Sequence, residues 1–337
     1  RGMVLSEREL GLSDEHEGIL VLGGDPAVGT PVVEVLPGGT VIEIENKAIT
    51  TRPDLWGHYG FARELGAVLD RDLRPLDLGD EPPSEPPGVK VRIDAPDLCP
   101  RYLGWVIGGV RIEPSPDWLK RRLEEAGQRP INNVVDLTNY ILLELGQPIH
   151  TFDRRQISGG EIVVRAAEPG ERVVTLDAVQ RTLPDGCCVI ADRERTVAIA
   201  GVMGCANSEV MEDTTEIILE VANFEMTSIR ATSKALALRT ESAVRFEKGL
   251  DPQGVPVAAR RFVQLLREIC PTATVQGGPS DEHGELPEAR SISMPAGWIE
   301  GRLGTPIGAD RIDRILTRLG FGVERTEDLL TVAVPSW

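Results

Sequence analysis

Residues 187–222 read CCVIADRERTVAIAGVMGCANSEVMEDTTEIILEVA, and this stretch decides the fold class. It contains three short apolar runs, at 187–191, 196–200 and 217–222, separated by charged residues and glycines. Short runs rich in Val and Ile and bounded by turn-forming residues are typical of buried β-strands. Two further runs, at 162–165 and 172–176, precede them. The centre of the chain is therefore predicted to be rich in strands.

Helical patterns surround these strands. A helix is expected from Ser115-Pro116-Asp117, which supplies a cap residue, a proline at the first helical position and an early acid. Strands are also expected at 32–36, 41–45 and 329–334. Apolar residues recur at helical spacing in five more segments, which are 57–69, 133–145, 225–237, 252–269 and 309–319. The predicted fold class is α+β and multidomain, with a central mixed sheet flanked by partial smaller α/β modules.

Proline-rich and glycine-rich stretches divide the chain. DEPPSEPPG at 80–88 has four prolines and three acids and cannot form a regular helix or strand. PTATVQGGPSDEHGELPEAR at 271–290 is rich in Gly, Pro and charge. Because the sequence begins with Arg1 and stops at Trp337 in a strand-like run, we expect it to be part of a longer protein.

The charge is unevenly distributed. The chain has 36 Lys and Arg against 53 Asp and Glu, a net charge of −17, which is a poor overall profile for a nucleic-acid-binding protein. Residues 90–277 hold 23 basic and 26 acidic residues, so this middle part is nearly neutral and is compatible with a local basic face. No apolar run approaches the ~18 residues of a membrane helix. We therefore expect no integral membrane protein.

Generic catalytic and metal motifs are nearly absent. The five cysteines form no CxxC pair, and with four histidines they give no zinc spacing, so reduced thiols in a cytoplasmic protein without a metal site are expected. The sequence has no Walker loop, GxSxG, HExxH or GxGxxG motif. Gly201-Val202-Met203-Gly204 is too short for a phosphate loop and is interpreted as a tight turn.

Two segments place polar residues among apolar ones in patterns that leave two interpretations open. Between Arg129 and His150, Asn and Asp residues either cap their own loop, which the residues alone favour, or belong to a site lined by Arg129 and His150. Residues 238–249, LRTESAVRFEKG, are either a solvated helix end or a site in which Thr240 and Ser242 offer hydroxyl groups.

Glu220 interrupts the apolar run at 217–222. Strand alternation places Glu220 on one face with Ile218 and Ala222. Exposure of a glutamate is the commoner outcome. Burial would instead indicate a functional group, because a buried carboxylate needs a partner.

At these segments the chain resembles the β subunit of bacterial phenylalanine–tRNA ligase, and the resemblance extends essentially from end to end. Shorter matches are SERELGL (6–12), ITTRPDLWGHYGFAREL (49–65) and AVPSW (333–337). Four long blocks carry the resemblance in order and spacing, namely RPINNVVDLTNYILLELGQPIHTFD (129–153), AGVMGCANSEV (200–210), ILEVANF (218–224) and LRTESAVRFEKGLDP (238–252).

The resemblance implies a domain order along the chain. It gives the end of an oligonucleotide-fold tRNA-binding insertion at 1–35, a helix–strand core module at 36–79, a Pro-rich linker at 80–89, a tRNA-editing domain at 90–275, a linker at 276–290 and a truncated winged-helix-like module at 291–337. In the family, the editing domain hydrolyses Tyr-tRNA(Phe) made by mistake, whereas the α subunit carries out aminoacylation.

The resemblance also implies the site residues. A phenylalanine side chain would leave a charged Glu220 unpaired, at a cost of about 1–3 kcal/mol or more, so this carboxylate would read the tyrosine hydroxyl. Ser242 stands where the family often has Ala. Matching positions give catalytic roles to His150, Arg129 and Gly204 and substrate-binding roles to Glu220, Thr240 and Ser242, and no metal ligand. We expect Arg129, His150, Gly204, Glu220 and Thr240 to converge on one cleft.

Partners and cofactors are likewise implied by the family. The full enzyme is a cytoplasmic α/β heterotetramer that uses ATP and Mg²⁺ and binds tRNA(Phe), with no membrane partner. The present chain is expected to need no cofactor and to act as an aminoacyl-tRNA ester hydrolase rather than as a ligase. The alternative is a structural and tRNA-positioning module without editing activity.

Overall fold

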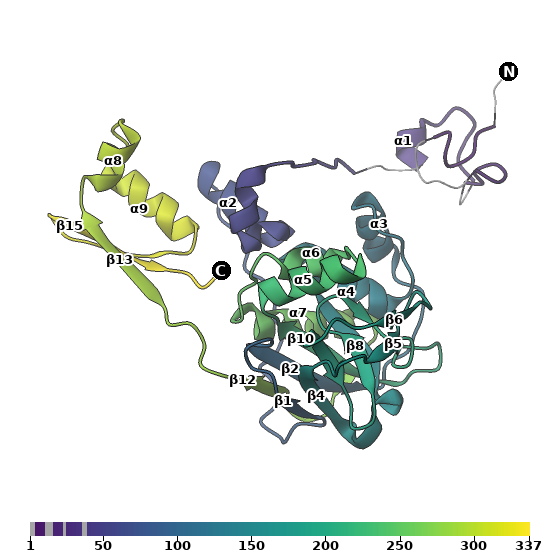
Figure 1. Cartoon of the computed structure of the whole chain (residues 1–337). Coiled ribbons are helices and arrows are strands. Elements are labelled where there is room, and N and C mark those ends of the chain that lie inside the picture. The colour runs from purple at the N-terminus through teal and green to yellow at the C-terminus, as the bar shows by residue number, and fades with distance from the viewer. Residues whose placement is uncertain (1–3, 11–15, 23–24, 36–38) are drawn as a thin grey trace. The chain divides into compact units, whose positions relative to one another are not determined.

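The structure is a computed structural model that describes residues 4–10, 16–22, 25–35 and 39–337. The chain divides into two units, residues 1–44 and 45–337 (Figure 1). Leu36, at the end of the strand expected at 32–36, lies outside the described residues, as do the last two residues of SERELGL.

The first unit does not contain the strands expected from its sequence. Val32–Val35 forms one short helix, α1, with no buried residue, and the stretch at 41–45 forms no strand. Both expectations were wrong for the same reason. β-branched residues form a strand only where another strand pairs with them, and the described part of this unit supplies no such strand.

The second unit confirms the helices expected from apolar periodicity. Short 3₁₀ helices precede α2 and follow β3, at Lys47–Thr51, Pro53–Trp56, Arg154–Gln156 and Ser158–Gly160. The longer helices before the C-terminal part are α2 (His58–Val68), α3 (Asp117–Glu125), α4 (Asn133–Leu145), α5 (Met226–Leu236), α6 (Glu241–Phe246) and α7 (Gly254–Ile269). α4 ends at Gly146, as expected, and this glycine has a φ of 73°, where a side chain would be strained.

The central sheet is antiparallel and has the strand order β11-β2-β10-β3, with β12 also paired to β2. β10 lies between β2 and β3, so Glu220 has Gly104 as its neighbour on one side and His150 on the other. The strands are β2 (Arg101–Gly108), β3 (Ile149–Asp153), β10 (Glu216–Asn223), β11 (Thr274–Val275) and β12 (Ser280–His283).

A second sheet has the order β1-β4-β7-β8-β9, in which β1 runs parallel to β4 and the other neighbours are antiparallel. Its strands are β1 (Lys90–Ile93), β4 (Glu161–Ala166), β7 (Cys188–Ala191), β8 (Thr196–Ile199) and β9 (Met203–Gly204). A two-stranded ribbon, β5 (Arg172–Val174) and β6 (Gln180–Thr182), lies between β4 and β7 in the chain. The strand runs expected in 162–222 are thereby confirmed.

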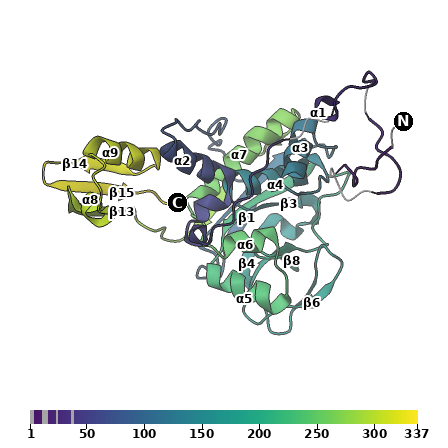
Figure 2. The same cartoon turned by 90° about the horizontal axis from the view of Figure 1, so that it is seen from above.

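Both faces of the central sheet are buried. On one face, Leu219 and Val221 of β10 join a core with α3, α4 and α7, including Phe262. On the other face, Ile218 and Ala222 join the core of the second sheet, together with residues of α5 and α6. Figure 2 shows α3, α4 and α7 on one side of the domain and α5 and α6 with β4 and β8 on the other. The predicted alternation of Ile218, Glu220 and Ala222 is therefore confirmed, but their face is covered.

The C-terminal part forms a small three-stranded antiparallel sheet, β13-β15-β14, with two helices. Ile312, Leu330 and Val332 are the buried centre of its core. In the described part of the chain, no helix is both long and apolar enough to cross a membrane. The elements are β13 (Arg290–Pro295), α8 (Trp298–Leu303), α9 (Ala309–Arg318), β14 (Gly322–Arg325) and β15 (Leu329–Val334).

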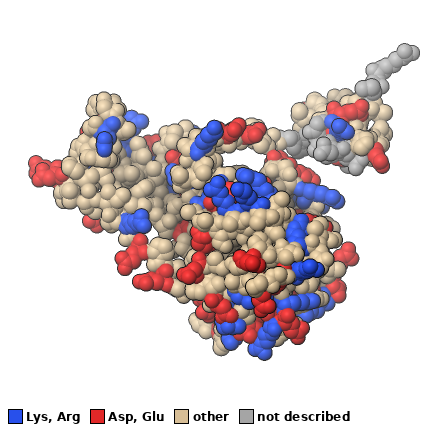
Figure 3. Space-filling view, in the orientation of Figure 1, with Lys and Arg blue, Asp and Glu red and all other residues tan. Residues whose placement is uncertain are grey.

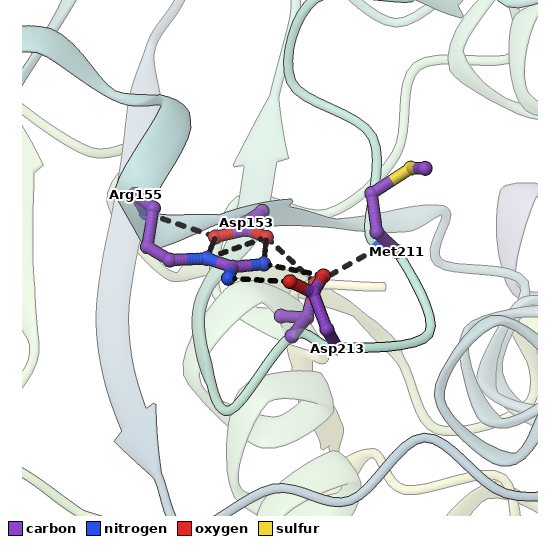
Figure 4. Close-up of polar contacts among 5 residues, drawn as sticks. Asp153, Arg155, Met211 and Asp213 are labelled. Atoms are coloured by element: carbon purple, nitrogen blue, oxygen red, sulfur yellow. Dashed lines mark hydrogen bonds and ion pairs between the residues drawn. The ribbon is translucent and has the colours of Figure 1, made fainter.

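A buried carboxylate fixes the end of β3. The Asp153 side chain is enclosed and accepts hydrogen bonds from the Thr214 hydroxyl at 2.6 Å and from the Arg155 guanidinium at 2.7 Å (Figure 4). Burial acts to raise the pKa of Asp153, but the hydrogen bonds from Arg155 and Thr214 outweigh it and lower the pKa below its ordinary value. Arg155 also pairs with the exposed Asp213. The cluster therefore holds the loop around 211–214 against the strand that carries His150.

Replacing Asp153 by Asn should destabilise the second unit, because the buried Thr214 hydroxyl and the exposed Arg155 guanidinium lose a charged acceptor. We expect a loss of about 1–3 kcal/mol in the free energy of unfolding. Asp213→Asn is the matched control, because it alters an exposed partner of the same arginine and should change stability by less than about 1 kcal/mol. Urea denaturation of the two variants measures the difference, and equal losses would contradict the role given to Asp153.

Candidate functional site

A cavity of about 120 Å³ lies where the central sheet faces the second sheet. Pro148, Ile149, His150 and Glu220 come to its wall from the central sheet and the segment before β3. Ile190, Ala198, Ile199, Met203 and Gly204 come from the second sheet, Gly201 and Val202 from the turn between β8 and β9, and Ser242 and Phe246 from α6. A larger cavity of about 560 Å³, lined by Tyr59, Arg63 and Trp337 among others, contains none of the six predicted site residues.

Glu220 is buried, with only 6% of its surface exposed, so the commoner expectation of exposure was wrong. Its Oε2 atom makes no hydrogen bond with the described residues. Burial raises the pKa of Glu220 to about 8, and the nearby Tyr102 hydroxyl acts in the opposite direction. The carboxyl is therefore mainly protonated at pH 7, so the charged form expected from the sequence is the minor one.

His150 stands beside Glu220 across the strand pair, because the two residues are directly opposite in the register of β3 and β10. Its ring packs edge-on against Phe152, with 4.7 Å between ring centroids. Burial lowers the pKa of His150 to about 4, so the imidazole is neutral at pH 7. A neutral imidazole can accept a proton or orient a water molecule.

Gly204 lies against the His150 ring. A Cβ atom at this position would stand 3.1 Å from Cε1 and Nε2 of His150, so any side chain would press on the imidazole. Gly201, at the start of the same turn, has a φ of 65°, and a Cβ there would clash with Phe246 at 2.9 Å. The two glycines therefore allow the turn to approach both the imidazole and α6 closely.

Thr240 and Ser242 hold this turn in place. The Thr240 hydroxyl donates to the Val202 carbonyl at 2.9 Å and accepts from the Ala243 amide, which caps α6. The Ser242 hydroxyl donates to the Gly201 carbonyl at 3.0 Å. Ser242 lines the cavity, whereas Thr240 supports it from behind. The hydroxyls offered by this segment are therefore used within the protein.

Arg129 is exposed and is not part of the cavity wall. The polar residues that follow it make the local bonds favoured by the residues alone. Asn132 accepts from the Val134 and Val135 amides and caps α4, and Asp136 accepts from the Ile131 amide at 2.7 Å. The start expected for α3 was wrong by one residue. Pro116 is the cap residue and Asp117 is the first helical residue, while the Ser115 hydroxyl donates to Asp136 instead of capping the helix.

The structure thus brings together His150, Gly204, Glu220 and Ser242 at one cavity and places Thr240 directly behind it. Arg129 does not join them in this conformation, and its role stays a prediction. Sequence reasoning missed Ile190, Ala198, Ile199 and Phe246, because apolar residues on buried strands and helices give no signal that they line a cavity rather than fill a core.

The model of the B3/4 domain family matches residues 98–271. These residues include the strands of the two sheets that line the cavity, and also α5, α6 and α7. The chain belongs to the B3/4 domain family. A second family, the tRNA synthetase B5 domain, matches residues 292–337 after the B3/4 domain.

Relatives match the chain over its whole length. It is 43% identical to a phenylalanine–tRNA ligase beta subunit from Solibacter usitatus, covering 100% of this chain and 43% of that protein. The corresponding protein of Salinibacter ruber is 42% identical, with 100% and 41% covered. One from Dehalococcoides mccartyi is 46% identical, with 95% and 39% covered. The resemblance seen in the sequence is confirmed, and the chain spans about two fifths of the length of these relatives.

A solved structure also overlaps with the chain. It is an N-terminal fragment of the phenylalanyl-tRNA synthetase beta subunit from Pyrococcus horikoshii, at 16% identity and a TM-score of 0.41, covering 85% of this chain and 79% of that one.

Within the described residues of the present chain, no group of three or more His, Cys, Asp and Glu side chains is arranged to hold a metal ion.

The protonated state of Glu220 makes a testable contribution to stability. An unfolded glutamate has a pKa near 4.5, whereas the folded pKa is about 8, so the folded protein holds a proton that the unfolded chain has lost between these values. Stability should therefore fall as pH rises through this window, by at most about 1.4 kcal/mol per pH unit. Glu220→Gln cannot titrate and should lose this part of the slope.

The measurement is the free energy of unfolding of both proteins from pH 6.5 to 8.5. This range avoids the effect of His150, whose lowered pKa removes stability only as pH falls from about 6.5 towards 4. Parallel curves for the wild type and Glu220→Gln would show that the carboxyl is not protonated in the fold.

Proposed function

We propose that the B3/4 domain of this chain is an editing hydrolase that cleaves misacylated Tyr-tRNA(Phe), as the similarity to phenylalanine–tRNA ligase beta subunits suggests. The observation that carries the proposal is the cavity between the two sheets, with a buried carboxyl at its wall and a neutral histidine beside it. A buried carboxyl without a hydrogen-bond partner has no structural use in an apolar core, where it costs free energy.

The size of the cavity suits an aromatic side chain. A dry cavity of roughly 150 Å³ is known to hold a benzene molecule, and this one has about 120 Å³ before any adjustment. A tyrosine ring would enter between the apolar walls and bring its hydroxyl to Glu220. The esterified carboxyl and the ribose would then remain at the mouth of the cavity.

Hydrolysis of an aminoacyl ester needs a placed water molecule and stabilisation of the developing oxyanion, because the ester is already activated. His150 is neutral at pH 7 and can orient or deprotonate water. The turn around Gly204 lies against the imidazole, and the backbone N–H of Gly204 is the group that we assign to the oxyanion. Thr240 and Ser242 keep this turn in position through their bonds to Val202 and Gly201.

An exposed basic surface supports binding of the tRNA backbone. Figure 3 shows a concentration of Lys and Arg over α5 and α6. Arg230 and Lys234 lie one turn apart on α5, and Arg239 follows that helix; all three are exposed and make no ion pair with the described residues. α5 packs against α6, which supplies Ser242 and Phe246 to the cavity. Phosphate groups approaching the cavity would meet these unpaired cations.

The proposal extends to the whole enzyme of which relatives of this chain form part. It includes an α-subunit partner in a heterotetramer, tRNA(Phe), ATP and Mg²⁺ for aminoacylation, a cytoplasmic location and the domain boundaries given above. Arg129 is retained as a catalytic residue that would act only after its segment approaches the cavity. A tRNA-positioning module without editing is the alternative, but the open cavity does not favour it, because a lost site would be expected to be filled.

Glu220→Ala should change selectivity as well as rate. Removing the carboxyl deletes the group that the tyrosine hydroxyl would satisfy, and it also removes the penalty that a phenylalanine ring would incur. Deacylation of Tyr-tRNA(Phe) should fall by roughly tenfold or more, and the ratio of Tyr-tRNA to Phe-tRNA hydrolysis should fall with it. Rates are measured with both charged tRNAs and the folded variant, and an unchanged ratio would remove Glu220 from this role.

A blocked cavity gives the control for this experiment. Ser242→Trp would fill the space between α6 and the turn at Gly201, so hydrolysis of both esters should fall together. A general loss of folding is distinguished by the melting temperature of each variant. Full activity of Ser242→Trp would contradict the placement of the substrate in this cavity.

Reversing the charge of the basic surface should weaken tRNA binding without altering the chemistry. The triple variant Arg230→Glu, Lys234→Glu and Arg239→Glu should raise KM for Tyr-tRNA by roughly tenfold or more at low salt, with kcat little changed. The matched control replaces Arg111, Lys120 and Arg121 by Glu, so the change in charge is the same. Arg111 precedes α3 and the other two residues lie in it, and this variant should leave KM unchanged. Equal effects of the two triple variants would show that the net charge alone is responsible.

A further inference from the structure

Tyr102 reaches Glu220 from the neighbouring strand. Tyr102 lies opposite Ala222 in the pairing of β2 with β10, and Glu220 lies opposite Gly104. The side chains of Tyr102, Glu220 and Ala222 therefore point to the same face of the sheet, on which Gly104 also lies. Tyr102 and Glu220 are diagonal neighbours on that face, a separation that an aromatic side chain can span.

Gly104 lies beside the tyrosine ring and lets the second sheet approach it closely. A Cβ on Gly104 would stand 3.9 Å from Cε1 of Tyr102, an ordinary contact, so the ring lies next to this glycine. The same Cβ would clash with Val91 at 2.9 Å, so Val91 packs over the glycine from the second sheet. The ring is therefore confined, and its hydroxyl end is directed along the strand towards Glu220.

The two polar groups that meet here are both unsatisfied. Tyr102 has no exposed surface, and neither its hydroxyl nor Glu220 Oε2 makes a hydrogen bond with the described residues. Unpaired buried polar atoms are rare and costly, so two of them side by side indicate a site whose hydrogen bonds are completed in use. Burial is the main cause that raises the pKa of Tyr102 well above its ordinary value, and the neighbouring Glu220 adds to it. The phenol therefore keeps its proton and can act as a hydrogen-bond donor.

We propose that Tyr102 is a positioning residue for Glu220. The Tyr102 hydroxyl donates a hydrogen bond to the enclosed carboxyl oxygen of Glu220, and the other carboxyl oxygen is left to bind the ligand. The inference rests on the proposed editing function for its ligand, a phenolic side chain. Tyr102 would favour the carboxylate form of Glu220, which is the stronger acceptor for a phenolic hydroxyl. Tyr102 itself does not belong to the cavity wall and would act only through Glu220.

Other titratable groups face Glu220 from each element packed around it. His150 lies opposite on β3, Cys188 approaches from β7, and Cys99 approaches from the segment before β2. Burial raises the pKa of both thiols, so they are neutral near pH 7, and the imidazole is neutral as well. The Tyr102 hydroxyl is therefore the strongest hydrogen-bond donor among these groups in their neutral forms.

The test is a direct titration of Glu220 in the full chain. The protein is labelled with ¹³C at the glutamate carboxyl carbon, and Glu220→Gln identifies the Glu220 resonance. In Tyr102→Phe, which keeps the ring and removes only the hydroxyl, the pH midpoint of Glu220 should rise by roughly one pH unit. The ratio of Tyr-tRNA to Phe-tRNA hydrolysis near pH 8 should fall roughly tenfold.

Tyr140→Phe is the matched control. Its hydroxyl accepts from Arg122 at 2.9 Å and donates to Glu144 in the helical layer, so its loss should leave the Glu220 midpoint and the selectivity unchanged. An unchanged midpoint in Tyr102→Phe would overturn the proposal, as would a raised midpoint with unchanged selectivity. If the wild-type chain hydrolyses neither ester, the editing function fails, while the titration still decides the link between Tyr102 and Glu220.

A second measurement covers the case in which Tyr102→Phe does not fold. The chain has only three tyrosines, so 3-fluorotyrosine labelling gives three ¹⁹F resonances in the otherwise native protein. The ¹⁹F chemical shift of Tyr102 should change with pH, with the same midpoint as the titration of Glu220. This change should be absent in Glu220→Gln. A Tyr102 resonance that does not respond to pH between 6 and 9 would overturn the proposal.

Discussion

The structure depends on the burial of the central sheet on both faces. β10 lies in the interior of that sheet, with helices against one face and a second sheet against the other. Such a strand must be apolar throughout, because neither of its faces meets water. Two buried polar residues interrupt this strand. Asn223 donates to the Leu250 carbonyl, whereas Glu220 sits where the two sheets leave a cavity instead of a packed core. The fold therefore gives a single carboxyl a buried environment, a raised pKa and a ligand-sized space at the same time.

The glycines control how closely the layers approach this carboxyl. Gly104 lets Val91 pack closely beside the Tyr102 ring, and Gly204 lets a turn of the second sheet approach His150. Gly201 allows the start of that turn to fit against Phe246, and the hydroxyls of Thr240 and Ser242 bind its carbonyls. Substitution at any of these positions would act on the carboxyl or the imidazole indirectly, by moving a neighbour. The geometry of the cavity is thus determined by the glycines that allow these close approaches and by the hydroxyl groups that hold the turn.

Much of the fold could be predicted from the sequence, for physical reasons that also explain the errors. α2, α4 and α7 each have one buried face, so their apolar residues recur at helical spacing. β2 was not predicted, because both of its faces are buried and its glycines interrupt the apolar run that would identify it. β3 carries Gln-Pro just before it and His150 within it, a composition that suits a loop equally well. In the site, polar residues inside apolar runs led to Glu220 and His150. The same reasoning selected Asn132, which caps α4, and Asp136, which binds the segment before that helix. Tyr102 gave no signal, since a tyrosine in an apolar strand is ordinary.

A protonated carboxyl reconciles stability with the proposed selectivity. An ionised Glu220 in the empty cavity would be a buried charge without a partner, which a fold of ordinary stability could not easily tolerate. The neutral acid is less costly, and it can both donate to and accept from a phenolic hydroxyl. A phenylalanine ring would displace water from the cavity and satisfy neither atom, at a cost of about 1–3 kcal/mol, which corresponds to roughly a tenfold to hundredfold preference for tyrosine. A donor that stabilises the ionised carboxyl, as Tyr102 would, makes it a stronger acceptor for the phenol and lowers the cost of burying its charge. The hydrogen-bonding of one carboxyl therefore links how stable the domain is to how well it can distinguish two side chains that differ by one oxygen atom.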